Sequence, residues 1–318
     1  MKNTTLLALT AFLGATGAAQ AQDYPVKPIR LIIPFQAGIG VDASTRQITS
    51  RLTPILGQPM VIENRPGAST IIGTEAAAKA APDGYTLYIG ASTAVAVVPF
   101  LYSKLPYNIE RDFTPISQTS VAFAGIIMNP ELPIAEVKDF IAISKKRPLN
   151  IGTIGNGSNY HLFGSWFALL TGADFNFVHY NTSAPVIDVV AGRLDAIFDG
   201  FAAHGGNLRA GKLKLLAVSG KERRSVFPDV PTFTQAGFPG FEPLAWGGFF
   251  APTGTPAPII DKINAAVVRV VRSQEMQDIV RASGNEPVGN SPGEFTAFVK
   301  SEQAKYSKVI KQLGIRLD

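Results

Sequence analysis

The chain has 318 residues, of which 46% are hydrophobic and 17% are charged, and its formal net charge is +5. This length exceeds what one hydrophobic core usually fills, so we expect two lobes. The absence of cysteine excludes disulfide bonds, thiolate zinc sites, cysteine nucleophiles and the lipid-bearing cysteine of a lipoprotein. The basic residues are scattered and are not interleaved with aromatic residues, which argues against a nucleic-acid-binding protein.

Residues 1–21 have the pattern of a secretory signal peptide. Lys2 supplies the positive charge, Leu6–Leu13 supplies a short apolar run, and Ala19–Ala21 fits the small-x-small cleavage pattern. An uncleaved anchor helix is the alternative, but the apolar run is short for a bilayer crossing. We therefore expect an exported protein that is free in the periplasm after cleavage.

Apolar strands alternate with helical stretches in the first part of the chain. Asp42 is expected to cap the first of these helices. Continuous apolar strands that are separated by helices predict a parallel sheet covered on both faces. The predicted elements are strands at Ile29–Ile33, Met60–Ile62 and Tyr85–Ile89, and helices from about Ala43 and over Glu75–Ala81.

The same alternation restarts after Phe113 and predicts a second α/β lobe. Gly172 and Gly192 are expected to end two of its helices. The predicted strands are Leu149–Thr153, Phe175–His179, Leu194–Phe198 and Leu213–Ser219, and the predicted helices are Tyr160–Thr171, Ser183–Ala191 and Phe201–Ala210.

Residues 227–258 are rich in proline, glycine and aromatic residues, and we interpret them as the return crossing between the lobes. Helices are predicted after it at about Pro258–Val271, Glu275–Ala282 and Pro292–Leu313, packed on the first lobe. The expected domains are therefore 22–122 for lobe 1, 123–226 for lobe 2, and 227–318 for the crossing and the return to lobe 1. Two crossings suit hinge closure around a ligand.

Two loops are the main candidates for a binding site. The first contains Phe35, Gln36, Ala37 and Gly38, and the second contains Gly155, Asn156, Gly157, Ser158 and Asn159. Each joins the end of a strand to the start of a helix, where ligands bind in open α/β sheets. Helix N-termini offer free N–H groups and a positive dipole end, which suit a carboxylate or a phosphate. The competing interpretations are a plain βα turn for the first loop and a helix N-cap for the second.

Other polar residues at strand ends are weaker candidates. Asp199 ends a strand, and because like charges repel we expect it to accept from a ligand hydroxyl or amine, or to order nearby loops. The histidines lack metal-binding spacing; His161 is a candidate for ligand contact, whereas His179 and His204 are expected to have packing or surface roles. The remaining candidates are hydroxyl-bearing pairs that equally suit helix caps: Ser92, Thr93, Thr182 and Ser183.

Taken together, several motifs resemble the Bug family, the substrate-binding proteins of tripartite tricarboxylate transporters. The resemblance covers essentially the whole mature chain. The motifs are YPVKPIRLIIPF (Tyr24–Phe35), IENRPGA (Ile62–Ala68), APDGYTL (Ala81–Leu87), LPYNIERDFTPIS (Leu105–Ser117), GNGS (Gly155–Ser158) with His161, SAP (Ser183–Pro185), IFD (Ile197–Asp199), RAGKLKLLAVS (Arg209–Ser219) and PDVPTFTQAGFPGFE (Pro228–Glu242).

This resemblance implies an α/β, two-lobe periplasmic binding fold, type II-like, in which each lobe is a mostly parallel sheet flanked by helices. It implies a protein that binds a small carboxylate between the lobes and meets a membrane permease of one large and one small integral subunit. We expect a di- or tricarboxylate or an aromatic carboxylate as ligand, and a monomer that uses no cofactor. The family holds the carboxylate mainly through backbone and water contacts from the two loops, and Asp199 is carried over as a ligand contact. Tyr160 and Phe201 add bulk near the expected pocket, which suggests an aromatic carboxylate.

Two other functions stay open from the residues. An enzyme acting on a phosphorylated substrate would need His161 or Asp199 as its base, and no nucleophile or metal motif supports it. A sensor subunit that presents its closed form to a membrane kinase is not separable from a transport receptor by sequence. We expect a binding protein and not an enzyme.

Overall fold

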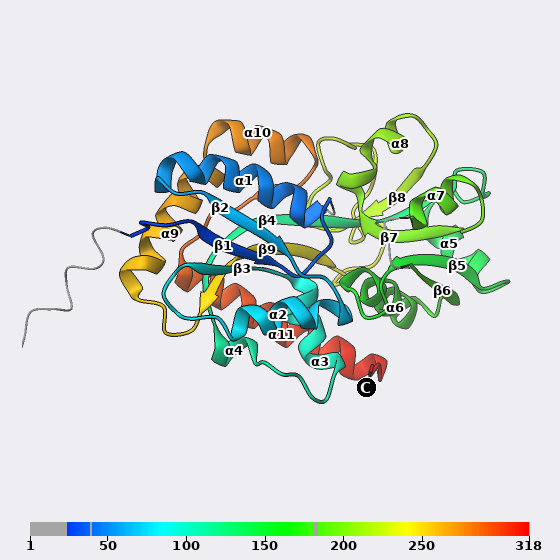
Figure 1. Cartoon of the computed structure of the whole chain (residues 1–318). Coiled ribbons are helices and arrows are strands. Elements are labelled where there is room, and N and C mark those ends of the chain that lie inside the picture. Colours follow the sequence, from blue (N-terminus) through cyan, green and yellow to red (C-terminus); the bar gives the residue numbers. More distant parts are fainter. Residues whose placement is uncertain (1–23, 39, 181–183, 318) are drawn as a thin grey trace, which may run out of the picture.

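The computed structural model describes residues 24–38, 40–180 and 184–317, and it forms two α/β lobes that lie side by side (Figure 1). The predicted signal peptide, residues 1–21, lies outside the described residues. Among the described helices, none combines the length and the apolar character that crossing a bilayer requires. The predicted fold class is confirmed.

The first lobe is built on three parallel strands extended by antiparallel ones. β1 (Ile29–Ile33) lies between β2 (Met60–Asn64) and β3 (Thr86–Ala91), and all three are parallel. β9 (Leu244–Pro252) then pairs antiparallel with β3 and with β4 (Phe113–Met128). Ile29, Leu31, Ile32 and Ile33 of β1 are fully buried, as expected for a strand that is covered on both faces.

The second lobe repeats the parallel triplet. β5 (Leu149–Ile154) lies between β6 (Phe175–Tyr180) and β7 (Ala196–Gly200), and both pairings are parallel. β7 and β8 (Lys214–Val218) each pair antiparallel with β4. The predicted parallel cores are thus present, and the antiparallel strands β4, β8 and β9 make both sheets mixed.

β4 is the element that joins the lobes. Its 16 residues pair with β9 as far as Phe123 and with β7 from Ala124 onward. The short strand β10 (Glu286–Pro287) also pairs with β4. The change of partner falls between Phe123 and Ala124, beside the expected boundary at 122/123; the exact domain limits stay predictions.

Helices cover both faces of each sheet. In the first lobe, α1 (Gly40–Leu56) and α9 (Ala257–Val271) share one apolar core with Leu31 and Ile33, while Ile32 faces the core on the other side. In Figure 1, α1 and α10 (Gln274–Ala282) lie above this sheet, and α2 (Ile71–Ala78) and α11 (Pro292–Leu313) lie below it. The remaining helical elements are α3 (Val98–Leu101), α4 (Ile109–Asp112), α5 (Val137–Ser144), α6 (Asn159–Thr171), α7 (Pro185–Val190), α8 (Gly205–Arg209), the 3₁₀ turns η1 (Ala68–Thr70) and η3 (Phe201–His204), and the π-helical turn η2 (Thr93–Val97).

Sequence analysis did not predict β4 or β9. β9 lies inside the stretch 227–258 that was interpreted as a plain crossing, and its Phe249 and Phe250 are fully buried. Earlier in the same stretch, Phe233 and Phe241 pack against Phe167 of the second lobe, with ring centroids 6.0 and 5.3 Å away. The segment therefore first completes the second core and only then returns to the first.

Candidate functional site

The two candidate loops occupy equivalent places in the two lobes. Residues 35–38 follow β1 and precede α1, and residues 155–158 follow β5 and precede α6. Each loop lies at the carboxyl edge of its parallel triplet, the edge where α/β sheets bind ligands. Thr93 also follows a strand of that edge in the first lobe, and it contacts Asn159 of the second. The two carboxyl edges therefore meet at the junction of the lobes.

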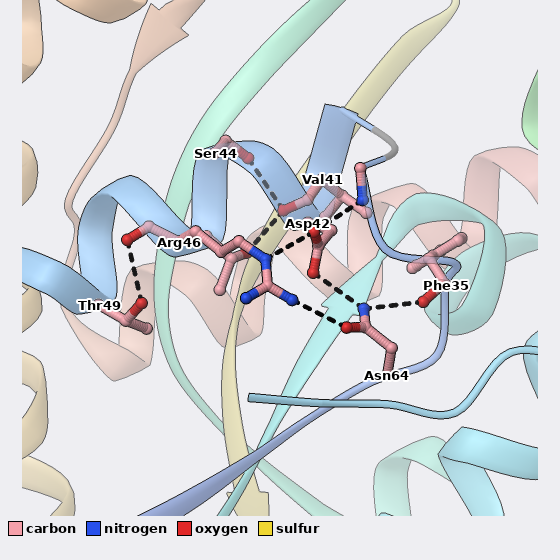
Figure 2. A network of polar contacts seen from close by, with 9 residues as sticks. Phe35, Val41, Asp42, Ser44, Arg46, Thr49 and Asn64 are labelled. Carbon is pink, nitrogen blue, oxygen red and sulfur yellow. Dashed lines mark hydrogen bonds and ion pairs between the residues drawn. The ribbon is translucent and has the colours of Figure 1, made fainter. Parts of the chain in front are cut away.

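A polar network fixes the first loop (Figure 2). The Asp42 carboxylate is 1% exposed and accepts from the Gly38 N–H at 2.9 Å, from Arg46 Nε at 2.8 Å and from Asn64 Nδ2 at 2.8 Å. Asn64 Nδ2 also donates to the Phe35 carbonyl at 3.0 Å, and Arg46 Nη2 donates to Asn64 Oδ1. Both ends of the loop are thereby tied to the end of β2.

Asp42 does not cap a helix that starts at Ala43, as was expected. The helix begins earlier, at Gly40, and Asp42 lies in its first turn with its carboxylate bent back to Gly38. Burial alone would raise the pKa of Asp42, but hydrogen bonds from Arg46, Gly38 and Asn64 hold it below its usual value. The carboxylate is therefore charged at neutral pH, and it is held inward by donors of its own.

In the second loop, most backbone N–H groups already have acceptors. Gly155 N donates to the Tyr180 carbonyl, Gly157 N to His161 Nδ1, and Asn159 N to Thr93 Oγ1. Ser158 caps α6 through its hydroxyl and donates its own N–H to the Gly155 carbonyl. Within the described part of the chain, Asn156 N–H has no acceptor. Fewer main-chain N–H groups of the second loop are therefore available to a ligand than the sequence suggested.

His161 supports the second loop from inside. It is 8% exposed, and because its Nδ1 accepts from Gly157, its Nε2 carries the proton. Burial, with a smaller contribution from His179, lowers the pKa of His161 to about 4, so the ring is neutral at physiological pH. His179 lies 4.8 Å away between ring centroids and hydrogen-bonds Thr153. His161 therefore orders the loop.

Asp199 is engaged with its own lobe. One carboxylate oxygen accepts from Gly200 N–H at 2.7 Å and the other from His204 Nε2 at 2.9 Å. His204, expected to have a packing or surface role, is buried and orients this carboxylate. Burial and the nearby Asp199 charge raise the pKa of Tyr160 above its usual value.

The structure contradicts the expectation for Phe201 and places the hydroxyl-bearing pair Ser92 and Thr93 at the lobe junction. Phe201 is fully buried and packs on Phe227 at 5.8 Å, so its bulk is part of the core and the argument for an aromatic ligand from Phe201 is wrong. Ser92 and Thr93 are buried at the end of β3, and Thr93 Oγ1 donates to Asn159 Oδ1 at 2.9 Å. Thr182 and Ser183 lie outside the described residues.

Sequence reasoning missed Asn64 and the turn that follows it. Asn64 belongs to the motif IENRPGA, which was quoted only as a family mark, although a polar amide at a strand end is a usable signal. Directly after the motif, Ser69 contacts the second loop: its hydroxyl lies 3.4 Å from the Asn156 carbonyl. Nothing in the sequence of this turn predicted its backbone conformation.

Two cavities of about 300 Å³ lie away from these loops. One, of about 310 Å³, is between η3, α8 and the end of α10, with Arg209 and Phe227 in its wall. The other, of about 300 Å³, is beneath the segment Pro99–Glu110. In the described ranges, no cluster of three or more histidine or acidic residues is suited to a metal ion.

Comparison with known proteins identifies relatives along the whole chain. The family model of the tripartite tricarboxylate transporter family receptor matches residues 44–315. Protein BugT of Bordetella pertussis is 34% identical over 325 aligned residues that cover 100% of both chains. A protein encoded in the tcbD–tcbE intergenic region of Pseudomonas sp. strain P51 is 30% identical, covering 96% of this chain and 91% of its own.

Solved structures agree with these relatives. A Rhodopseudomonas palustris protein with adipate has a TM-score of 0.86 and 34% identity, covering 92% of this chain and 99% of its own. MatC from the same species, with bound malate, has a TM-score of 0.83 and 31% identity, covering 90% and 100%. The periplasmic binding protein BugD also has a TM-score of 0.83, at 28% identity, covering 92% and 99%. The chain is therefore a member of the tripartite tricarboxylate transporter receptor family, to which the Bug proteins belong.

Proposed function

We propose that this protein is a periplasmic receptor that binds a small carboxylate between its lobes and delivers it to a membrane permease with one large and one small integral subunit. The observation that carries the proposal is the pairing of the two strand-to-helix loops at the lobe junction. Residues 35–38 and 155–159 follow the carboxyl ends of β1 and β5, and Thr93 bonds to Asn159 between them. A ligand held by both loops would favour the closed arrangement.

The chemistry of the loops suits an anion that is bound by neutral donors. Arg46 is the nearest cation to the first loop in its network, and it is engaged by Asp42 and Asn64. In the described part of the chain, the donors left for a ligand include the main-chain N–H of Asn156 and those in the first turn of α1, which has no preceding helical carbonyls. The relatives solved with adipate and malate support a carboxylate over other anions.

Asp199 limits which chemical groups of the ligand can lie beside it. Both of its oxygens accept from groups in its own lobe, so it tolerates a ligand hydroxyl better than a second carboxylate placed beside it. We therefore place the ligand carboxylate near Asn156 and α1, and any hydroxyl nearer Asp199. The contacts of Thr182 and Ser183 stay predictions.

The two alternatives have weaker support. The enzyme hypothesis needs His161 or Asp199 as a free base, but His161 Nδ1 and both Asp199 oxygens are already hydrogen-bonded. A sensor for a membrane kinase would use the same closed form. Loss of uptake of the bound acid after deletion of the gene supports transport, whereas uptake unchanged with loss of a transcriptional response supports sensing.

Calorimetric titration of the mature protein tests the carboxylate assignment. Malate, adipate and an aromatic dicarboxylate are the three ligands, and inorganic phosphate is the competing anion. Binding of at least one carboxylate with no binding of phosphate is the expected result. Native mass spectrometry of protein from its own host would weigh a trapped ligand, and a trapped phosphorylated compound would contradict the proposal.

A glycine pair localises the site. Gly155 has φ +83° and open space around an added Cβ, so Gly155→Ala strains the loop without a steric clash. Gly293, in the first turn of α11, has equally open space and an ordinary φ, and Gly293→Ala is the matched control. We expect the first substitution to weaken ligand binding about tenfold through loss of about 1 kcal/mol or more, and the second to leave affinity unchanged.

A further inference from the structure

The turn between β2 and α2 has an unusual backbone. Ala68, Ser69 and Thr70 have φ values of +44°, +51° and +81°, directly after Gly67 at +124°. Side chains with a Cβ rarely adopt positive φ even singly, and such conformations persist only where surrounding contacts hold them, often at functional sites. Three in succession require a local explanation.

Contacts on both sides hold this turn. Thr70 N donates to the Gly67 carbonyl at 3.0 Å, and Thr74 Oγ1 donates to the Thr70 carbonyl at 2.9 Å. Tyr102 OH donates to Ser69 Oγ at 3.2 Å. Ser69 Oγ then faces the second lobe, where the Asn156 carbonyl lies 3.4 Å away. The conformation of the turn therefore brings one hydroxyl to the lobe junction.

The partner of Ser69 is the residue on which the second loop depends for ligand binding. Gly155, Gly157, Ser158 and Asn159 use their N–H groups within the protein, and Asn156 has the loop amide without an acceptor among the described residues. The Asn156 carbonyl belongs to the Asn156–Gly157 peptide, whose Gly157 N–H is already held by His161. A hydrogen bond to this carbonyl therefore limits rotation about the bonds of the Asn156 Cα, and with it the direction of the Asn156 N–H on the other side of that Cα. The contact is long, so it strengthens if the lobes close further.

We propose that Ser69 is a positioning residue for the carboxylate ligand. Its hydroxyl links the strained turn of the first lobe to the Asn156 carbonyl of the second, which orients the Asn156 amide toward the ligand in the closed form. The inference rests on the proposed function for the identity of the ligand, a carboxylate. The contact between the Ser69 hydroxyl and the Asn156 carbonyl does not depend on that function. Tyr102, by donating to the Ser69 hydroxyl, leaves the Ser69 proton to point across the junction.

Two substitutions separate the hydroxyl from the backbone strain. Ser69→Ala removes the hydroxyl and keeps a side chain at positive φ. Ala68→Gly keeps the hydroxyl and relieves the neighbouring strain, so it is expected to raise the unfolding midpoint by a few °C. In calorimetric titration with the best-bound carboxylate, Ser69→Ala should weaken affinity roughly fivefold, the effect of one net hydrogen bond. Ala68→Gly should bind within twofold of the unchanged protein.

Hydrogen exchange of the ligand-free protein tests the contact independently of any ligand. The amides of residues 155–159 should exchange faster in Ser69→Ala than in Ala68→Gly. Equal exchange in the two variants, or equal affinity of Ser69→Ala and the unchanged protein, overturns the inference. Failure of every carboxylate to bind the unchanged protein instead overturns the proposed function, and the exchange comparison still decides the role of Ser69.

Discussion

The loops at residues 35–38 and 155–159 have the same place in the topology, yet different chemistry holds them. The first is tied by a carboxylate, a guanidinium and an amide: Asp42, Arg46 and Asn64. The second is tied by neutral groups: the imidazole of His161 and the hydroxyls of Ser158 and Thr93. One side of the lobe junction therefore depends on a charge that persists at neutral pH, and the other on a ring that must stay uncharged.

This difference matters for an anion-binding cleft. A buried negative charge beside an anion is unfavourable unless its field is compensated, and Arg46 together with two N–H donors compensates Asp42. In the second loop, a neutral His161 accepts a main-chain proton without adding any charge. Both arrangements leave the net charge near the loops small, and the proposed function then assigns ligand binding to main-chain donors whose positions are fixed.

The largest expected effect comes from removing the charged member of the first network. Asp42→Ala removes the buried acceptor of Gly38 N and Arg46 Nε and one of the two acceptors of Asn64 Nδ2, and it leaves a gap where the 1%-exposed carboxylate was packed. We expect the free energy of unfolding to fall by about 3 kcal/mol, together with loss of measurable carboxylate binding. Urea denaturation and calorimetry measure the two effects.

An exposed aspartate provides the control for that experiment. Asp278 lies on α10, where it accepts from Gln274 at the surface, and Asp278→Ala should change stability by less than about 0.5 kcal/mol. A loss of about the same size in both variants would contradict the role assigned to Asp42.

The second loop should be sensitive to moderate acid. Because burial lowers the pKa of His161 from 6.5 to about 4, the unfolded chain binds this proton more readily than the folded one. The stability that the neutral ring contributes is complete above pH 6.5, falls as the pH drops through 6.5, and is lost toward pH 4. Between pH 7 and pH 5 we expect a loss of about 2 kcal/mol, measured by urea denaturation at each pH.

His161→Gln keeps an acceptor for Gly157 N–H and removes the titrating group. Its stability should change less over the same pH range, and the difference between the two proteins is the contribution of His161. The first loop does not interfere, because the pKa of Asp42 lies below its usual value and the carboxylate stays charged throughout. If the stability of the unchanged protein and of His161→Gln fell in parallel with pH, titration of His161 would not be the cause of the acid sensitivity.

The sequence was informative wherever one local rule decided the structure. The apolar run Ile29–Ile33 predicted β1 to the residue, and the predicted helix Pro292–Leu313 has the same bounds as α11. β4 was not predicted because only its last six residues, Phe123–Met128, are continuously buried, whereas polar and half-exposed positions such as Thr114, Gln118, Thr119 and Ser120 interrupt the apolar pattern before them. β9 was not predicted because Gly247 and Gly248 interrupt its apolar pattern. Gly248 is required there, because an added Cβ would lie 2.5 Å from the Phe295 ring and 2.7 Å from the Ser117 carbonyl.

The position of the two candidate loops in the fold was predicted better than their hydrogen bonds were. Strand-to-helix loops were correctly assigned to the junction because the α/β alternation fixes which strand ends share an edge. Which amides stay free was not predictable, because the acceptors of Asn159 N and Gly155 N come from Thr93 and Tyr180, distant in sequence. Asn64 and Ser69 were missed for the same reason: their partners are 29 and 87 residues away.

Two N-caps give a smaller and cleaner test of the second loop. Ser158 caps α6 by accepting from His161 N at 3.2 Å, and Ser291 caps α11 by accepting from Glu294 N at 3.3 Å. Each serine-to-alanine substitution should cost about 1 kcal/mol of stability, because a helix loses one N-terminal acceptor. Only Ser158→Ala should also weaken carboxylate binding. Equal affinities of the two variants would mean that the α6 cap plays no part in the site.

The smallest effect is expected from the bridge between the lobes. Thr93 Oγ1 both donates to Asn159 Oδ1 at 2.9 Å and accepts from Asn159 N at 3.3 Å. A double-mutant cycle with Thr93→Val and Asn159→Ala measures the side-chain part of this pair, for which we expect a coupling of about 0.5–1 kcal/mol in stability. If the bond belongs to the closed form, the coupling should increase when saturating ligand is present, because ligand and bridge favour the same arrangement of the lobes. A coupling that is unchanged by ligand would mean that Thr93 and Asn159 stay bonded whether the cleft is open or closed, and closure would then have to occur around them.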